Sequence, residues 1–136
     1  MASKKIIDNQ TMQETINIEP ADDTPGVVLD KENGVFKFFG RSLPEDVNKF
    51  YGNIQSWFTE YCKSPNPETE IVFNLDYFNS STARILVKIL IETENIHNVK
   101  SKVHVSWFYN RKDYVMHDRG NELKSVLKIP FDLKAI

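Results

Sequence analysis

Short stretches in the first third of the chain alternate apolar with polar residues, as strands with one buried face do. These stretches predict a short edge strand at 16–18 and two further strands at 27–30 and 35–40. Asn33 and Gly34 lie between the last two, and an Asn-Gly pair is the preferred chemistry of a tight hairpin turn. We therefore expect an antiparallel hairpin near the start of the folded region.

Apolar residues at three- and four-residue steps predict two long helices. The first follows 47–61, and Ser42 with Glu45 offers a capping box at its start. The second follows 81–94 and comes directly after an apolar strand at 71–75. A strand that leads at once into a helix is typical of a β-α-β unit.

The last third of the chain continues this alternation of strand and helix. Its pattern predicts a strand at 103–109, a short helix at 121–127 and an end strand at 129–133. Residues 1–15 are polar without periodicity, and we expect a flexible N-terminal tail there. Strands that alternate with helices favour an α/β fold. We therefore expect one domain, 16–136, with a single mixed β-sheet and helices packed on it.

Composition and charge narrow the function classes. The 136 residues include 17 basic and 19 acidic side chains, for a net charge of −2, whereas a non-specific nucleic-acid-binding protein needs a basic surplus. No apolar run approaches the roughly 20 residues that a membrane span needs, and no secretory signal is visible. Cys62 is the only cysteine, which favours a reducing compartment, the cytoplasm. We expect no nucleic-acid partner and no membrane partner.

The sequence lacks the motifs of common enzyme sites. It has no phosphate-binding loop and no dinucleotide-binding motif, so we expect no cofactor. His97, His104 and His117 do not have the spacing of metal ligands. We therefore expect no catalytic residue and no metal site. Two alternatives stay open, a small hydrolase that combines Ser80 or Ser81 with a histidine and a structural self-association module.

The stretch Asn79-Ser80-Ser81-Thr82 places an amide and three hydroxyls where the second long helix begins. The first backbone N–H groups of a helix lack intrahelical partners, and the helix dipole is positive there, so a phosphate is accepted readily. The cluster fits an ordinary N-cap. It also fits a phosphorylation site at one of the hydroxyls, Ser80, Ser81 or Thr82, and the two interpretations are compatible.

Motifs spread along the chain carry a resemblance to a known family. In order, they are Thr24-Pro25, Leu29-Asp30, Asn33-Gly34-Val35, Gly40-Arg41-Ser42-Leu43-Pro44-Glu45, Phe50-Tyr51, Trp57, Leu75-Asp76-Tyr77-Phe78-Asn79-Ser80-Ser81-Thr82, Val105-Ser106-Trp107-Phe108-Tyr109 and Gly120. By their order and spacing the chain resembles the SiaC family of bacterial regulatory phosphoproteins, from Ile16 to the C-terminus. The resemblance implies a STAS-like fold, similar to that of anti-sigma-factor antagonists.

The same resemblance implies a mode of action. Family members are phosphorylated at the hydroxyl residue directly after the asparagine, which is Ser80 in this sequence. A Ser/Thr protein kinase adds the phosphate, and a metal-dependent Ser/Thr phosphatase removes it. In the best-understood family system the unphosphorylated form binds and activates a diguanylate cyclase, which raises cyclic di-GMP and favours biofilm. We therefore expect a non-enzymatic, cytoplasmic signalling protein whose partner is a diguanylate cyclase.

The expected docking surface surrounds Ser80. Aromatic residues are enriched at interfaces, so Tyr77 and Phe78 are partner-binding candidates, and alternation alone leaves open whether one ring contacts the partner or both belong to the core. Arg41, at a strand end, fits a solvated side chain or a local salt bridge, and it also fits a partner-binding residue that pairs with a phosphate on Ser80 or with an acidic partner. The remaining partner-binding candidates are Asn79, Ser81 and Arg84. The loop 110–113 carries two basic residues where relatives tend to be acidic, so a partner that touches this loop is expected to differ.

Overall fold

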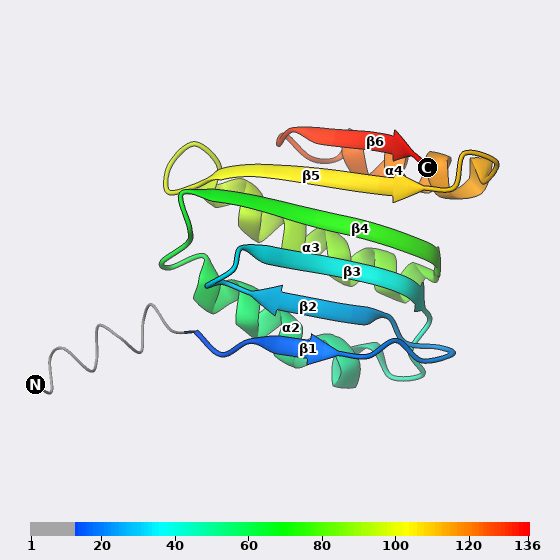
Figure 1. Cartoon of the computed structure of the whole chain (residues 1–136), viewed down its shortest axis with the longest axis horizontal. Coiled ribbons are helices and arrows are strands. Elements are labelled where there is room, and N and C mark those ends of the chain that lie inside the picture. The colour runs from blue at the N-terminus through cyan, green and yellow to red at the C-terminus, as the bar shows by residue number, and fades with distance from the viewer. Residues whose placement is uncertain (1–12) are drawn as a thin grey trace, which may run out of the picture.

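A computed structural model describes residues 13–136, and most of the predicted tail, residues 1–12, lies outside this range. In chain order, the described elements are β1 (Ile16–Ile18), β2 (Gly26–Asp30), β3 (Val35–Ser42), α2 (Val47–Tyr61), β4 (Glu68–Phe78), α3 (Ser80–Ile96), β5 (Lys102–Tyr109), α4 (Tyr114–Ser125) and β6 (Phe131–Ala135). Within 13–136 the strands form one six-stranded mixed sheet with helices packed on it (Figure 1). The predicted α/β architecture is therefore confirmed.

The order of the strands across the sheet is their order along the chain, from β1 to β6. β2 is antiparallel to both β1 and β3, whereas β3, β4, β5 and β6 are parallel to one another. The predicted hairpin joins β2 to β3. Gly34 in its turn has a φ of 67°, a left-handed value that glycine adopts without steric cost.

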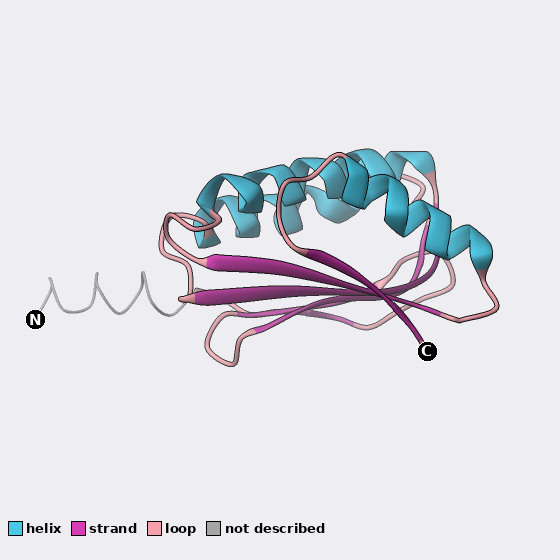
Figure 2. Ribbon diagram, turned by 90° about the horizontal axis from the view of Figure 1, so that it is seen from above, coloured by secondary structure: helices cyan, strands magenta, loops and turns pink. Residues whose placement is uncertain are grey.

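The described helices all lie on one face of the sheet (Figure 2). Each of them links one parallel strand to the next, and such crossovers are right-handed in nearly all proteins. Because each crossover also moves the chain in the same direction across the sheet, each helix is placed on the same side. α2 packs along α3, while α4 packs on β4, β5 and β6.

The core between the helices and the sheet is rich in aromatic rings. Phe38 and Phe73 stack with their ring centroids 5.2 Å apart, and Phe73 meets Trp107 at 5.3 Å. From the helix side, α2 contributes five buried residues: Tyr51, Ile54, Trp57, Phe58 and Tyr61. The three- and four-residue spacing of the sequence therefore marks the inward face of this helix, as predicted.

The predicted capping box at the start of α2 is wrong. The helix begins after Asp46, whose side chain accepts a hydrogen bond of 3.1 Å from the backbone N–H of Lys49. Ser42 is instead the last residue of β3 and is fully buried. Its hydroxyl is bonded inside the core, so it cannot turn outward to cap a helix. Glu45 is exposed just before the helix.

Other boundaries differ from the prediction at the sheet centre and near the C-terminus. β4 extends beyond the predicted 71–75 at both ends because β3 and β5 flank it and extend its ladder. α4 begins at Tyr114 rather than near residue 121, because Asp113 caps it by accepting a hydrogen bond from the N–H of Met116. This helix has only three buried residues, so its apolar periodicity is weak.

The last residues of the predicted tail lie against α2. The side chain of Gln13 donates a hydrogen bond of 2.7 Å to the carbonyl of Trp57. The indole N–H of Trp57 in turn donates to the carbonyl of Glu14. Residues 13 and 14, which were expected in a flexible tail, are therefore hydrogen-bonded to α2.

Candidate functional site

The start of α3 is capped by Asn79, as predicted. Its side-chain oxygen accepts a hydrogen bond of 2.9 Å from the N–H of Thr82, and its carbonyl accepts one of 3.0 Å from the N–H of Ala83. Within 13–136, the backbone N–H groups of Ser80 and Ser81 donate to no protein acceptor. These two donors sit at the positive end of the helix dipole, which is the arrangement that accepts an anionic oxygen.

The three hydroxyls of the cluster differ sharply in exposure. Ser80 is exposed, Ser81 is half-buried and Thr82 is fully buried. Thr82 was an alternative phosphorylation site in the sequence, but in the folded chain its hydroxyl faces the core and no kinase can reach it. Ser80 is therefore the most accessible hydroxyl at this helix start.

A buried hydroxyl network holds the first turn of α3 to the end of β3. The hydroxyl of Thr82 donates to the carbonyl of Ser42 at 3.0 Å and also lies 2.9 Å from the Ser42 hydroxyl. The Ser42 hydroxyl shares a further hydrogen bond of 2.7 Å with the phenol of Tyr51 on α2. Burial raises the pKa of Tyr51 to about 12, so its phenol keeps its proton. Ser80 is thus displayed from a rigid base.

A β-bulge decides which aromatic ring of β4 reaches the surface. Gly40 and Arg41 are successive in β3, but their partners in β4 are separated by Asp76, which is an extra residue. Side chains alternate between the two faces of a strand, and one extra residue reverses that alternation. As a result Tyr77 is 40% exposed and Phe78 is 1% exposed. Phe78 is a core residue, contrary to its expected place on the docking surface, and Tyr77 is the exposed ring.

Arg41 lies beside Tyr77, on the side of the site formed by β3. Its guanidinium carbon is 5.5 Å from the centre of the Tyr77 ring, in a cation–π contact. Its Nε donates a hydrogen bond of 3.3 Å to the carbonyl of Asp22. Among the described residues, the terminal guanidinium nitrogens of this exposed side chain have no protein acceptor.

Arg84 and Arg119 lie on the other side of Ser80. Arg84 is exposed one helical turn after Ser80, so the two side chains share one side of α3. Arg119 of α4 donates a hydrogen bond of 2.9 Å to the carbonyl of Phe78, and its guanidinium lies 4.0 Å from the centre of the Phe78 ring. Sequence reasoning missed Arg119, because its partner is distant in the chain and no local motif marks it.

The ends of the parallel strands gather these residues at one edge of the sheet. β3 ends with Arg41 and Ser42, β4 ends just before Asn79, and β5 ends before the basic loop 110–113. Carboxyl ends of adjacent parallel strands meet at the same edge, which is where α/β proteins commonly bind other molecules. The predicted site residues therefore come together, and the loop 110–113 lies at their edge of the sheet.

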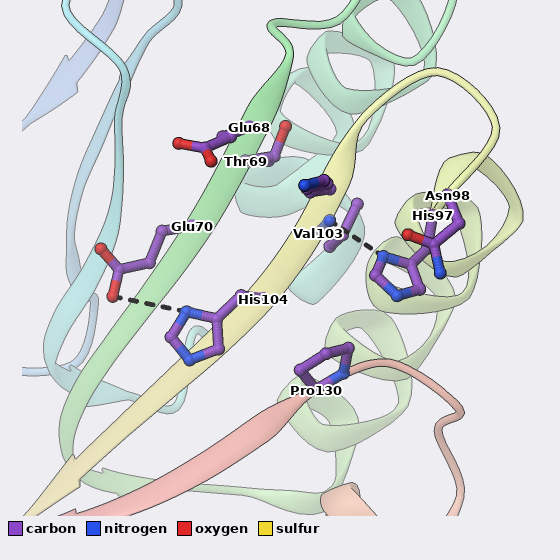
Figure 3. A pocket seen from close by; sticks show the side chains of 9 residues that line it. Glu68, Thr69, Glu70, His97, Asn98, Val103, His104 and Pro130 are labelled. Carbon is purple, nitrogen blue, oxygen red and sulfur yellow. Dashed lines mark hydrogen bonds and ion pairs between the residues drawn. The ribbon is translucent and has the colours of Figure 1, made fainter.

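The histidines of the chain lie elsewhere. A cavity of about 580 Å³ opens at the start of β4 and β5 (Figure 3). Ser80 follows the opposite end of β4. At the cavity, His97 accepts a hydrogen bond of 3.0 Å from the N–H of Val103. His104 lies between the carboxylates of Glu70, at 3.7 Å, and Asp132, at 2.9 Å. These imidazoles are committed to neighbouring groups of the sheet and helix end.

No hydrogen bond joins a histidine to Ser80 or Ser81 within 13–136. His117, the third histidine, packs against Tyr109 and lies 3.0 Å from a carboxylate oxygen of Asp118. In the part of the chain that the structure describes, no group of three His, Cys, Asp or Glu residues is arranged to hold a metal ion. No described helix is both long and apolar enough to span a membrane.

Comparisons with known proteins find similarity over nearly the whole described chain. The sequence model described as "SiaC family regulatory phosphoprotein" matches residues 18–136. An uncharacterised protein of Pseudomonas aeruginosa strain UCBPP-PA14 is 23% identical over 120 residues, which cover 88% of this chain and 95% of that protein.

Solved structures show the same arrangement of elements. The crystal structure of apo-SiaC from P. aeruginosa is similar with a TM-score of 0.83 at 23% identity, over 90% of this chain and 99% of SiaC. A crystal structure of the diguanylate cyclase SiaD in complex with its activator SiaC, from the same organism, contains a chain similar with a TM-score of 0.83 at 23% identity, over 89% of this chain and 99% of that one. At this level of identity these likenesses establish the fold.

Proposed function

The chain belongs to the SiaC family of regulatory phosphoproteins, and from that premise we propose that it is a non-enzymatic binding protein switched by reversible phosphorylation of Ser80. The observation that carries the proposal is the exposure of the Ser80 hydroxyl at a capped helix start with two backbone N–H groups unused among the described residues. A kinase can reach this hydroxyl, and the folded chain can accept the resulting phosphate.

Phosphorylation of Ser80 is expected to leave the fold intact. A negative group at a helix N-terminus gains about 0.3–1 kcal/mol from the dipole, and the buried network under Thr82 does not include Ser80. The modification therefore acts through the surface. It adds a charge of roughly −1.5 to −2 next to exposed Asp76 and among the cations Arg41 and Arg84. A partner that pairs with those cations would lose them to the phosphate.

The proposed partner is a diguanylate cyclase, which binds the unphosphorylated form. Support comes from SiaC of P. aeruginosa, which shares this fold and is the activator in complex with the cyclase SiaD. The proposed surface comprises Tyr77 and Arg41 on one side of Ser80, with Asn79, Ser81 and Arg84 around the helix start. A Ser/Thr kinase and a metal-dependent Ser/Thr phosphatase complete the cycle, and cyclic di-GMP and biofilm are the output.

The proposed setting is the cytoplasm, and the proposed functional unit is a single domain covering 16–136. The free thiol of Cys62 fits a reducing compartment. Burial raises the pKa of this thiol to about 11, so Cys62 stays protonated and is not a nucleophile at neutral pH.

The test combines phosphosite mapping with a reconstituted cyclase assay. Protein purified from its native cells with phosphatases inhibited is expected to carry phosphate on Ser80. Purified diguanylate cyclases of the same host are then assayed for cyclic di-GMP formation with wild type, Ser80→Ala and Ser80→Asp. We expect activation by wild type and Ser80→Ala and its loss with Ser80→Asp.

A matched control is Ser56→Asp, which adds the same charge at an exposed serine of α2, away from the proposed surface. This variant is expected to activate as wild type does. Equal activation by Ser80→Asp, Ser80→Ala and wild type, together with an unmodified Ser80 in cells, would refute the switch.

A further inference from the structure

An apolar groove of about 420 Å³ runs between α3 and α4, beside the proposed switch. Its apolar lining is provided by Phe78, Ala83, Val87, Leu123 and Val126. Residues 83 and 87 are one turn apart on α3, and Leu123 in the last turn of α4 is one turn before the C-cap Val126, so each helix presents a strip along its axis. Val126 is 59% exposed, although it lies next to a hydrophobic floor.

The groove exists because α4 packs on the sheet and not along α3. α2 covers the other side of α3, while α4 makes its contacts with β4, β5 and β6. Arg119 fixes the position of α4 at one end of the groove through the Phe78 carbonyl and ring. The two helices are thereby held apart over the apolar strip.

Charged residues form the rim, and cations dominate it. The rim comprises Arg84 and Lys88 on α3 and Arg119 and Glu122 on α4. Within residues 13–136, none of these side chains is within ion-pair distance of an opposite charge. The apolar floor therefore lies under a rim of three cations and one carboxylate, which leaves a net positive charge.

We propose that this groove is the docking site for an amphipathic helix of the regulated partner, with apolar anchors on one face and acidic residues along both flanks. That this partner is regulated through Ser80 rests on the function proposed above. An amphipathic helix suits two parallel strips of side chains at helical spacing, because its own anchors recur at three- and four-residue steps. Acidic flanks suit the rim because they pair with Arg84, Lys88 and Arg119.

Arg84 links the groove to the switch. It lines the rim and also lies one turn after Ser80 on α3, which is the spacing at which side chains on a helix pair. A phosphate on Ser80 would draw the Arg84 guanidinium towards the helix start and repel acidic flanks of the docked helix. Phosphorylation thus weakens docking without entering the groove.

The test uses a synthetic helical peptide of about 15 residues, long enough for three or four turns. The peptide carries leucines at i, i+3, i+4 and i+7 with glutamates on both flanks, and a second peptide replaces the glutamates by lysines. Each is titrated into isotope-labelled, unphosphorylated full-length protein and followed by two-dimensional NMR. We expect saturable shifts for the glutamate peptide at 78, 83–88 and 119–126, and weaker binding of the lysine peptide.

Val126→Glu is the groove variant, and Val99→Glu is its matched control. Val99 is 77% exposed in the turn after α3 and does not line the groove. Both changes put the same charge at an exposed valine, so both variants fold. We expect Val126→Glu to weaken the glutamate peptide about tenfold, as for loss of one apolar anchor, and Val99→Glu to bind as wild type does.

Two further arms test the charges and the link to Ser80. Arg84→Glu combined with Lys88→Glu is expected to reverse the preference, so that the lysine peptide binds more tightly. Protein carrying phosphoserine at position 80 is expected to bind the glutamate peptide about three- to fivefold more weakly.

Absence of groove shifts, equal affinity of the Val126 and Val99 variants, or affinity unchanged by phosphoserine would each overturn the docking proposal. The cyclase assay remains independent of these arms. If the peptide does not bind the groove while Ser80→Asp still abolishes cyclase activation, the phosphorylation switch is supported and the partner docks on another surface.

Discussion

Gly120 and Gly52 are both helical glycines, and replacing each by alanine is expected to change stability in opposite directions. A Cβ atom at Gly120 of α4 would lie 2.5 Å from Cδ1 of Trp107 and closer still to its Nε1. Trp107 is fully buried, and its Nε1 donates a hydrogen bond of 3.0 Å to the carbonyl of Met116. A Cβ atom at Gly52 of α2 would meet nothing within 4 Å.

The magnitudes follow from these contacts. Alanine gains about 1 kcal/mol over glycine in a helix interior, so Gly52→Ala is expected to raise the free energy of unfolding by about that amount. At Gly120 the same gain is opposed by overpacking, about 1–3 kcal/mol, and by disturbance of the Trp107 hydrogen bond, about 1 kcal/mol. The rigid indole cannot move away, since Phe73, Phe78 and Phe131 pack against it. We expect Gly120→Ala to lower stability by about 1–3 kcal/mol.

Urea unfolding followed by tryptophan fluorescence measures both variants against wild type. The expected gap between them is roughly 2–4 kcal/mol, from the sum of the terms above. Equal or greater stability of Gly120→Ala than of Gly52→Ala would show that α4 is not pressed against Trp107. The close approach would then not position Arg119, the neighbour of Gly120 in the chain, at the end of the groove.

Three further predictions concern the start of α3, its buried network and the thiol. Asn79→Ala is expected to cost about 1 kcal/mol of stability through loss of the N-cap, and a thermal melt equal to that of wild type would contradict the cap. Thr82→Val should cost about 1–3 kcal/mol in urea unfolding, because it leaves one hydroxyl proton of the buried Ser42–Tyr51 pair without an acceptor. Ser80→Ala should stay within about 0.5 kcal/mol of wild type, and similar costs for both would place Thr82 outside the core. The pKa of Cys62 is raised from 9.0 to about 11 chiefly by burial, so its contribution to stability is fully present below pH 9 and is lost as the pH rises through 11. Titration of unfolding free energy over that range should be flatter in Cys62→Ala, and rapid alkylation of the native thiol at pH 8 would contradict the burial.

Much of the fold could be predicted from local patterns. The Asn33-Gly34 turn and the three- and four-residue spacing of α2 each reflect interactions between residues close in sequence, and those are what a pattern reports. The weakly periodic start of α4 could not be found in this way, because its side chains are mostly exposed and its position is set by contact with the sheet. Ser42 was misassigned for a related reason: its hydroxyl bonds to Thr82 and Tyr51, which come from other elements.

The candidate site likewise contains features that the sequence predicts and features that depend on the tertiary structure. The cap at Asn79 and the hydroxyl of Ser80 after it could be predicted from the sequence, because both depend on residues that are adjacent in the chain. The burial of Phe78 and the exposure of Tyr77 depend on a bulge that involves β3 as well as β4. Arg119 reaches Phe78 from α4, and only the tertiary structure brings the two together.

The agreement between strand order in the chain and in the sheet has a kinetic consequence. Each described strand pairs only with its neighbours in sequence, so each closure joins nearby segments and costs little loop entropy. No strand has to wait for a distant one to complete its ladder. During synthesis, each β-α unit that leaves the ribosome can add to an edge that already exists, and the parallel half of the sheet can grow in one direction from the β2–β3 hairpin.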